Sequence, residues 1–71
     1  MAFDNETLAG NLRANRARVR MSQNEVAKAI GVSEASVNNW ENALYIPGVD
    51  SIYALADLYH TSIDQLAGFS A

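Results

Sequence analysis

Two helix-start signals flank a single glycine in the first half of the chain, and this pattern limits the fold more than any other feature. Ser22-Gln-Asn-Glu25 has the form of a capping box, in which the serine hydroxyl and the glutamate carboxylate each satisfy a free backbone N–H. Gly31 can end that helix in a left-handed conformation, and Ser33 can cap the next one. The sequence therefore predicts a helix-turn-helix over about residues 22–42.

Further helices are predicted on both sides of this pair. Apolar residues recur at helical spacing over residues 8–19, after the candidate N-cap Asp4, and again over residues 49–59. Ser62-Ile-Asp-Gln65 repeats the capping-box form and starts a short last helix through about Gly68. Strand alternation is absent, so we expect an all-α fold, a compact bundle of five short helices in one domain over residues 1–71.

Composition excludes several classes of function. The 71 residues include no cysteine and one histidine, so no thiol nucleophile, cysteine zinc site or nucleophile–base set can be assembled. We expect neither an enzyme nor a metal or cofactor site. No window approaches the roughly 18 apolar residues that span a bilayer, and the lack of cysteine suits a reducing compartment. We therefore expect a cytoplasmic protein without membrane contact.

Charge is distributed unevenly along the chain. The formal net charge of −3 argues against nucleic acid, whose binding depends on Lys and Arg neutralising phosphates. However, residues 1–32 hold all five basic side chains against three acidic ones, whereas residues 33–71 hold five carboxylates and no Lys or Arg. The basic side chains are Arg13, Arg16, Arg18, Arg20 and Lys28. Residues 1–32 therefore form a basic segment whose side chains can bind DNA phosphate.

The second helix of the helix-turn-helix carries a candidate recognition surface. Val37 and Trp40 lie three residues apart and face inward, which directs a set of small polar residues outward. A helix about 10–12 Å across fits the major groove of B-DNA, where Asn pairs with adenine and Glu accepts from cytosine. Solvated polar faces also occur on helical hairpins that never meet DNA, so this geometry leaves both interpretations open.

The order of residues 22–47, SQNEVAKAIGVSEASVNNWENALYIP, resembles the lambda-repressor-like, or XRE-like, helix-turn-helix family. The shared pattern is S-Q-x-x-[LV]-A…[IL]-G-V-S…[IV]-x-x-W-E-N…P, and the resemblance extends from about Leu8 to Leu66. It implies a sequence-specific DNA-binding transcriptional regulator, with repression as the expected role. It also implies that the third helix docks in the major groove of double-stranded DNA.

The resemblance implies roles for individual residues. Gln23 and Asn42 correspond to family positions that contact DNA phosphate, and Arg16 and Glu41 to a structural ion pair. Arg20 and Lys28, with Arg13 and Arg18, are the side chains expected to supply further phosphate contacts. The positions expected to read bases are Ser33, Glu34, Ala35, Ser36, Asn38 and Asn39.

Departures from the family pattern lie in the turns. Arg20, Ala43 and His60 stand where the family commonly has glycine, which predicts strained turns, with Asn42 as the alternative residue for the strained conformation in place of Ala43. Leu44-Tyr45-Ile46 is apolar where the family often has Lys or Arg. This segment either packs back on the core of the domain or is covered by a second copy or another protein.

We expect a homodimer, because one small module offers few phosphate contacts and tight binding generally needs two half-sites. The family often dimerises through its last helices, here the segment with Asp57, Asp64, Leu66 and Phe69. The alternative function is a protein-interaction module, antitoxin-like or partner-binding, that uses the Leu44–Ile46 segment. Salt distinguishes the two functions, because phosphate-led binding weakens steeply with salt and an apolar interface does not.

Overall fold

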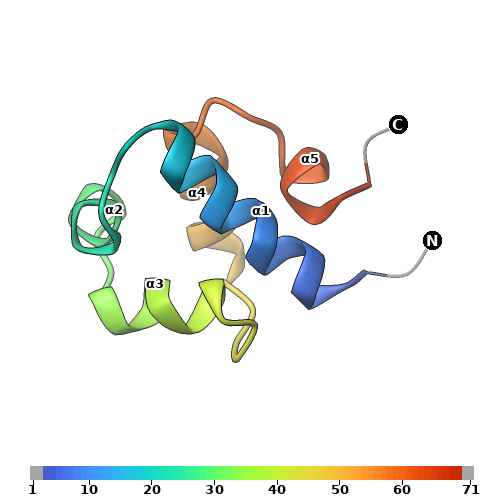
Figure 1. Ribbon diagram of the computed structural model, residues 1–71, viewed down its shortest axis with the longest axis horizontal. Coiled ribbons are helices and arrows are strands. Elements are labelled where there is room, and N and C mark those ends of the chain that lie inside the picture. Colours follow the sequence, from blue (N-terminus) through green and yellow to red (C-terminus); the bar gives the residue numbers. More distant parts are fainter. Residues whose placement is uncertain (1–2, 70–71) are drawn as a thin grey trace.

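Helices form where the cap signals predict them. A computed structural model describes residues 3–69, and residues 1, 2, 70 and 71 of the expected domain lie outside the described residues. The helices are α1 (Asn5–Arg18), α2 (Gln23–Ile30), α3 (Glu34–Glu41), α4 (Val49–Leu58) and α5 (Ile63–Ala67) (Figure 1). The described part of the chain contains no strand. The expected all-α fold of five short helices is confirmed.

Side-chain caps set most of the helix starts. Both expected capping boxes form, at Ser22 before α2 and at Ser62 before α5. Asp4 caps α1 by accepting from the backbone N–H of Glu6, and Ser33 caps α3 by accepting from that of Ser36. The start of α4 has no side-chain cap and follows Gly48. Four of the five helices therefore begin at residues whose side chains satisfy free backbone donors.

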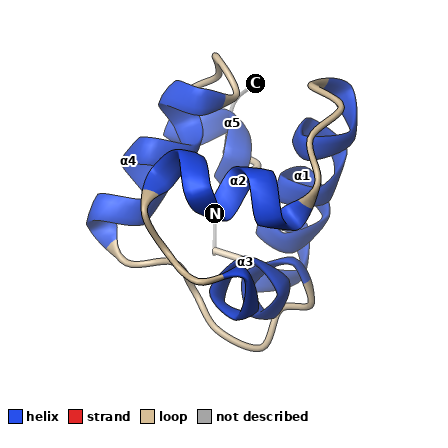
Figure 2. Cartoon of the chain, turned by 90° about the vertical axis from the view of Figure 1, so that its left-hand side faces the viewer, coloured by secondary structure: helices blue, strands red, loops and turns tan. Residues whose placement is uncertain are grey.

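The helices pack around one core. α2 packs against α3, α1 contacts both α3 and α5, and α4 contacts α2 and α5 (Figures 1 and 2). Every helix contributes to the core, whose buried hydrophobic members are Leu8, Leu12, Val26, Ala27, Val37, Trp40, Leu55, Ala56, Tyr59 and Leu66. The inner side of α3 packs against α1 and α2, and its outer side is exposed to solvent.

All five helices end in a residue with positive φ, and only two of these residues are glycines. Gly31 and Gly68 have φ of 76° and 83°, whereas Arg20, Ala43 and His60 have φ of 59°, 59° and 53°. At each non-glycine end, two backbone hydrogen bonds close the last turn in the pattern of a Schellman motif. The strained turns at these positions are therefore confirmed. Asn42, with φ of −104°, does not replace Ala43, because the hydrogen-bond pattern requires the left-handed residue one position later.

Glycine at two of these ends is expected to stabilise the fold. A non-glycine residue at positive φ costs about 1 kcal/mol, and this strain disappears when the Cβ is removed. Ala43→Gly and His60→Gly should each raise the free energy of unfolding by up to about that amount. Thermal denaturation should show the midpoint rising by about 4–8 °C per kcal/mol for a domain of this size.

Gly31→Ala is the matched control, because a Cβ at this position would meet no atom within 4 Å. Its cost is therefore backbone strain alone, and the melting midpoint should fall by a similar amount. Unchanged melting in all three variants would contradict the strain account.

Candidate functional site

The outer face of α3 presents small polar side chains. Glu34, Ala35 and Asn38 are exposed and Asn39 is half-buried, while Val37, Trp40 and Glu41 on the opposite side are buried. The expected base-reading residues therefore lie together at one end and along one face of α3. Ser33 and Ser36 contact each other, since their hydroxyls are 2.9 Å apart, and Ser33 also caps the helix.

A buried ion pair joins the ends of α1 and α3. Arg16 Nε lies 2.7 Å from Glu41 Oε2, and Arg16 Nη2 lies 3.0 Å from Glu41 Oε1. The Glu41 side chain is 3% exposed and that of Arg16 is 25% exposed. Hydrogen bonding to Glu41 raises the pKa of Arg16 above its ordinary value. The pair that the resemblance implied is present, and its two parallel bonds fix the rotation of α3.

Hydrogen bonds extend from this pair to the surface of α3. Gln23 Nε2, at the start of α2, donates to Glu41 Oε1 over 3.1 Å. Asn38 Nδ2 in turn donates to Gln23 Oε1 over 3.3 Å. We call Arg16, Glu41, Gln23 and Asn38 the polar network. It connects a buried carboxylate to two residues expected to contact DNA, so those side chains are held before any ligand arrives.

A second contact joins the first turns of α2 and α3. Asn24 Nδ2 donates to Glu34 Oε1 over 3.2 Å, although both side chains are exposed. Asn42, at the end of α3, donates from Nδ2 to the backbone oxygen of Asn38 over 2.8 Å. Asn39 makes no side-chain hydrogen bond within residues 3–69, so its amide keeps both donor and acceptor free.

Two arginines expected to bind phosphate also donate hydrogen bonds within the protein. Arg13 donates to the backbone oxygen of Glu41, and Arg18 donates to that of Tyr59 and to Asn15 Oδ1. These carbonyls end α3 and α4, where free acceptors and the helix dipole favour a cation. Arg20 and Lys28 are both exposed, and neither side chain makes a hydrogen bond or ion pair within the described residues.

The segment after α3 is apolar and exposed. Leu44, Tyr45 and Ile46 are 64%, 65% and 57% exposed, and Val49 at the start of α4 is 70% exposed. Of the two alternatives for this segment, packing of Leu44 and Ile46 back on the core is therefore wrong. Pro47 is buried instead and holds the loop at one point, which turns its neighbours outward. We call Leu44, Tyr45, Ile46 and Val49 the apolar patch.

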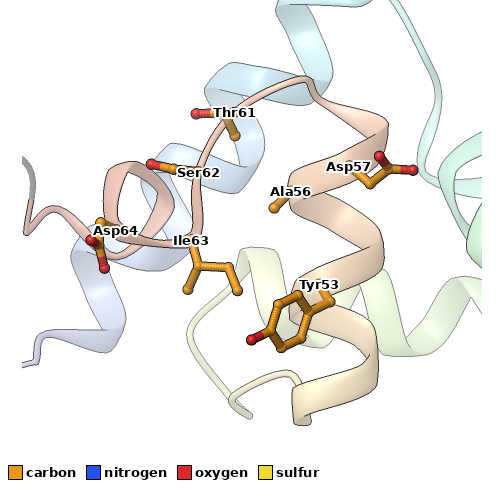
Figure 3. A pocket seen from close by; sticks show the side chains of 7 residues that line it. All are labelled: Tyr53, Ala56, Asp57, Thr61, Ser62, Ile63 and Asp64. Atoms are coloured by element: carbon orange, nitrogen blue, oxygen red, sulfur yellow. The ribbon is translucent and has the colours of Figure 1, made fainter.

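The expected dimer segment needs a related correction. Leu66 is fully buried in the core, so it is not available to a partner, whereas Phe69 is 39% exposed. Asp57 and Asp64 are exposed beside a groove between α4 and α5 (Figure 3). Sequence periodicity could not separate a core leucine from an interface leucine on so short a helix.

Tyr59 is fully buried and lies within the electrostatic influence of Arg16 and Glu41. Its hydroxyl has no hydrogen-bond partner among the described residues. Burial, and secondarily the negative charge of Glu41, raises the pKa of Tyr59 to about 12. The ring is therefore held in its neutral form.

The described residues contain no group of three or more acidic or histidine side chains that could hold a metal ion. Within the same residues, no helix is long and apolar enough to cross a membrane.

Comparison with known proteins gives one family and a consistent set of structures. A helix-turn-helix family model, HTH_3, matches residues 12–66, which is most of the chain. The P22 c2 repressor, solved in complex with a synthetic operator, is 25% identical with a TM-score of 0.84, covering 89% of this chain and 96% of that one. No curated protein matches the sequence significantly.

Two further solved structures are similar. The SOS-response transcriptional repressor LexA from Eubacterium rectale is 32% identical with a TM-score of 0.83, covering 94% of this chain and 73% of that one. The restriction-modification controller protein C.AhdI from Aeromonas hydrophila is 22% identical with a TM-score of 0.81, covering 89% and 96%. The last likeness concerns the fold alone.

Removing the buried carboxylate should destabilise the protein strongly. Glu41→Gln leaves the Arg16 guanidinium without its counter-charge, at a cost of about 3 kcal/mol, near the lower end for a buried pair because Arg16 is partly exposed. Urea denaturation measures this loss. Glu34→Gln on the exposed face is the control and should change stability by less than about 0.5 kcal/mol. Equal stability of the two variants would contradict the structural role of the pair.

Tyr59 should make the stability of the folded protein decrease at alkaline pH. Its pKa is raised in the folded state, so its contribution to stability is complete below about pH 10 and is lost as the pH rises through about 12. Tyr59→Phe should remove this alkaline loss of stability, and it should leave stability near neutral pH equal or higher because a buried hydroxyl without a partner disappears.

Thermal melts from pH 8 to 12 measure this difference. Tyr53→Phe is the control, because it changes an exposed tyrosine and leaves Tyr59 in place. Parallel alkaline profiles for the wild type and Tyr59→Phe would contradict the assignment.

Proposed function

The chain belongs to the lambda-repressor-like helix-turn-helix family of DNA-binding transcription regulators, and we propose that it represses transcription by docking α3 in the major groove of a specific operator. The observation that carries this proposal is the outer face of α3, which is small, polar and held in place by the polar network. Major-groove docking needs a protruding helix without bulky outward side chains, and α3 meets that need.

Base reading is assigned to the residues at the start and outer face of α3. Asn39 is the leading candidate for a bidentate contact with adenine, because its amide has no other partner within residues 3–69. Glu34 keeps one carboxylate oxygen free of Asn24 and can accept from cytosine. The remaining members of the proposed set are Ser33, Ala35, Ser36 and Asn38.

Phosphate contacts are assigned to the edges of the helix-turn-helix. Gln23 lies in the first turn of α2 and uses one amide hydrogen on Glu41, which leaves a second for a phosphate oxygen. Asn42 lies at the other end of α3, and Arg20 and Lys28 are exposed cations without protein partners in the described range. Two cations and two amides are few contacts for tight binding.

A second copy would double these contacts, so we propose that the protein binds DNA as a twofold dimer. The apolar patch is the proposed dimer surface, since contiguous exposed apolar side chains mark an interaction site. A twofold axis there would repeat α3 on two half-sites about one helical turn apart. Such a regulator acts on DNA in the cytoplasm.

The second candidate function is a protein-interaction module on the same scaffold. The apolar patch favours it directly, because the same exposed side chains could contact an unrelated protein. In that case the interaction would change little between 50 and 200 mM salt, whereas phosphate-led binding would weaken steeply.

Selection from a random duplex library tests the proposal. We expect an enriched inverted repeat that the protein binds at least about tenfold more tightly than a scrambled duplex. Asn39→Ala should cost about 1–3 kcal/mol on the enriched sequence and little on the scrambled one, because base contacts carry specificity. Gln23→Ala should weaken both duplexes alike. Failure to enrich any sequence would contradict the proposal.

The dimer is tested by disrupting the apolar patch. Ile46→Asp places a charge in the proposed interface and should shift sedimentation toward the monomer and reduce operator affinity by tenfold or more, since half the contacts are lost. Phe3→Asp, at an exposed aromatic outside both the patch and the last two helices, is the control. A patch variant that sediments and binds DNA like the control would overturn this interface.

A further inference from the structure

A shallow groove of about 400 Å³ lies between α4 and α5, and α3 contributes no residue to it. Its apolar part is formed by Tyr53 and Ala56 from α4 and Ile63 from α5 (Figure 3). Tyr53 is 64% exposed, so its ring offers a large unpacked surface at the edge of the groove. The groove is thus an open apolar site apart from the proposed DNA-binding surface.

Two hydroxyls in the groove, those of Thr61 and Ser62, already have hydrogen-bond partners. Thr61 Oγ1 donates to Gln65 Oε1 over 2.6 Å, and Ser62 Oγ accepts from the backbone N–H of Gln65 over 3.0 Å. These bonds belong to the cap of α5 and engage Thr61 and Ser62. The Tyr53 hydroxyl and the carboxylates of Asp57 and Asp64 remain, and the carboxylates are the charged groups that an occupant would meet.

Both carboxylates lack a counter-charge. Arg16–Glu41 is the one ion pair within residues 3–69, and neither Asp57 nor Asp64 makes a side-chain hydrogen bond there. Residues 29–71 contain no Lys or Arg, so α4, α5 and the segment that joins them carry neither side chain. The groove therefore combines an apolar floor with two rim carboxylates that make no ion pair within residues 3–69.

We propose that this groove binds a short cationic segment of a partner protein. An aliphatic side chain of that segment lies against Tyr53 and Ile63, and flanking Lys or Arg side chains pair with Asp57 and Asp64. Charge complementarity of this kind steers association and selects the partner. Because α3 takes no part in the groove, the partner and DNA can be bound together.

Other occupants are disfavoured by charge. Nucleic acid and anionic lipid would both meet the negative rim with like charge. A second copy seated symmetrically on the groove would bring the same two carboxylates of each protomer into one interface, where like charges cost several kcal/mol. This argument separates the groove from the apolar patch, whose four residues are uncharged.

The test is a titration of the ¹⁵N-labelled chain, followed by NMR at 50 mM salt. The probe is the peptide acetyl-Lys-Lys-Leu-Leu-Lys-Lys-amide, and two comparison peptides replace all lysines by glutamate or both leucines by serine. We expect the backbone amides of the groove residues to shift with the first peptide, and either replacement to weaken the effect by about fivefold or more.

Variants of the acidic residues test whether the rim of the groove binds the cationic peptide. The double variant Asp57→Asn, Asp64→Asn should bind the cationic peptide about fivefold more weakly, the loss expected for two exposed ion pairs. Asp50→Asn, which removes a carboxylate outside the groove lining, should change binding less than twofold. Melting curves confirm that each variant is folded, and unchanged operator binding by the double variant separates this site from the proposed DNA function.

Four results would overturn the proposal. They are shifts located away from α4 and α5, equal binding by the double variant, equal binding of the leucine-free peptide, and concentration-dependent shifts of the same amides without peptide. The last result would identify a second copy as the occupant.

Discussion

The Arg16–Glu41 ion pair is the interaction on which the arrangement of the helix-turn-helix depends. Burying a carboxylate is costly unless its oxygens are satisfied, and here Glu41 accepts two bonds from Arg16 and one from Gln23. The three residues come from α1, α2 and α3, so a single satisfied charge defines how three helices meet. The hydrophobic core beneath them is less directional, because apolar contacts alone permit small rotations of α3.

The same network links stability to recognition. Gln23 and Asn38 each use part of their hydrogen-bonding capacity within the protein and keep part for a ligand. Side chains held in this way lose little conformational freedom when they bind, which favours affinity for a given number of contacts. Arg13 and Arg18 serve the fold differently, because they cap helix ends and leave few cations for phosphate. The proposed regulator therefore depends on shape and preorganisation more than on net positive charge.

Local signals predicted the helices well, and the remaining features depended on tertiary structure. Ser22 and Ser62 start helices through bonds to residues three positions away, so their role is visible in the sequence. The Arg16–Glu41 pair joins residues 25 positions apart, and its prediction came from the family resemblance. No sequence signal identified the Asn24–Glu34 contact, because it exists only once α2 and α3 have packed. Leu66 is buried whereas the apolar patch is exposed, and the sequence did not distinguish them. An apolar pattern alone does not reveal which side chains the fold buries.

Methylation interference on the selected duplex tests the central claim, that α3 reads the operator through the major groove. Methylation of guanine N7 changes the major groove, whereas methylation of adenine N3 changes the minor groove. The account predicts that N7 methylation blocks binding at two clusters of positions about one helical turn apart. Interference confined to adenine N3, or absent at every base, would contradict docking of α3 in the major groove.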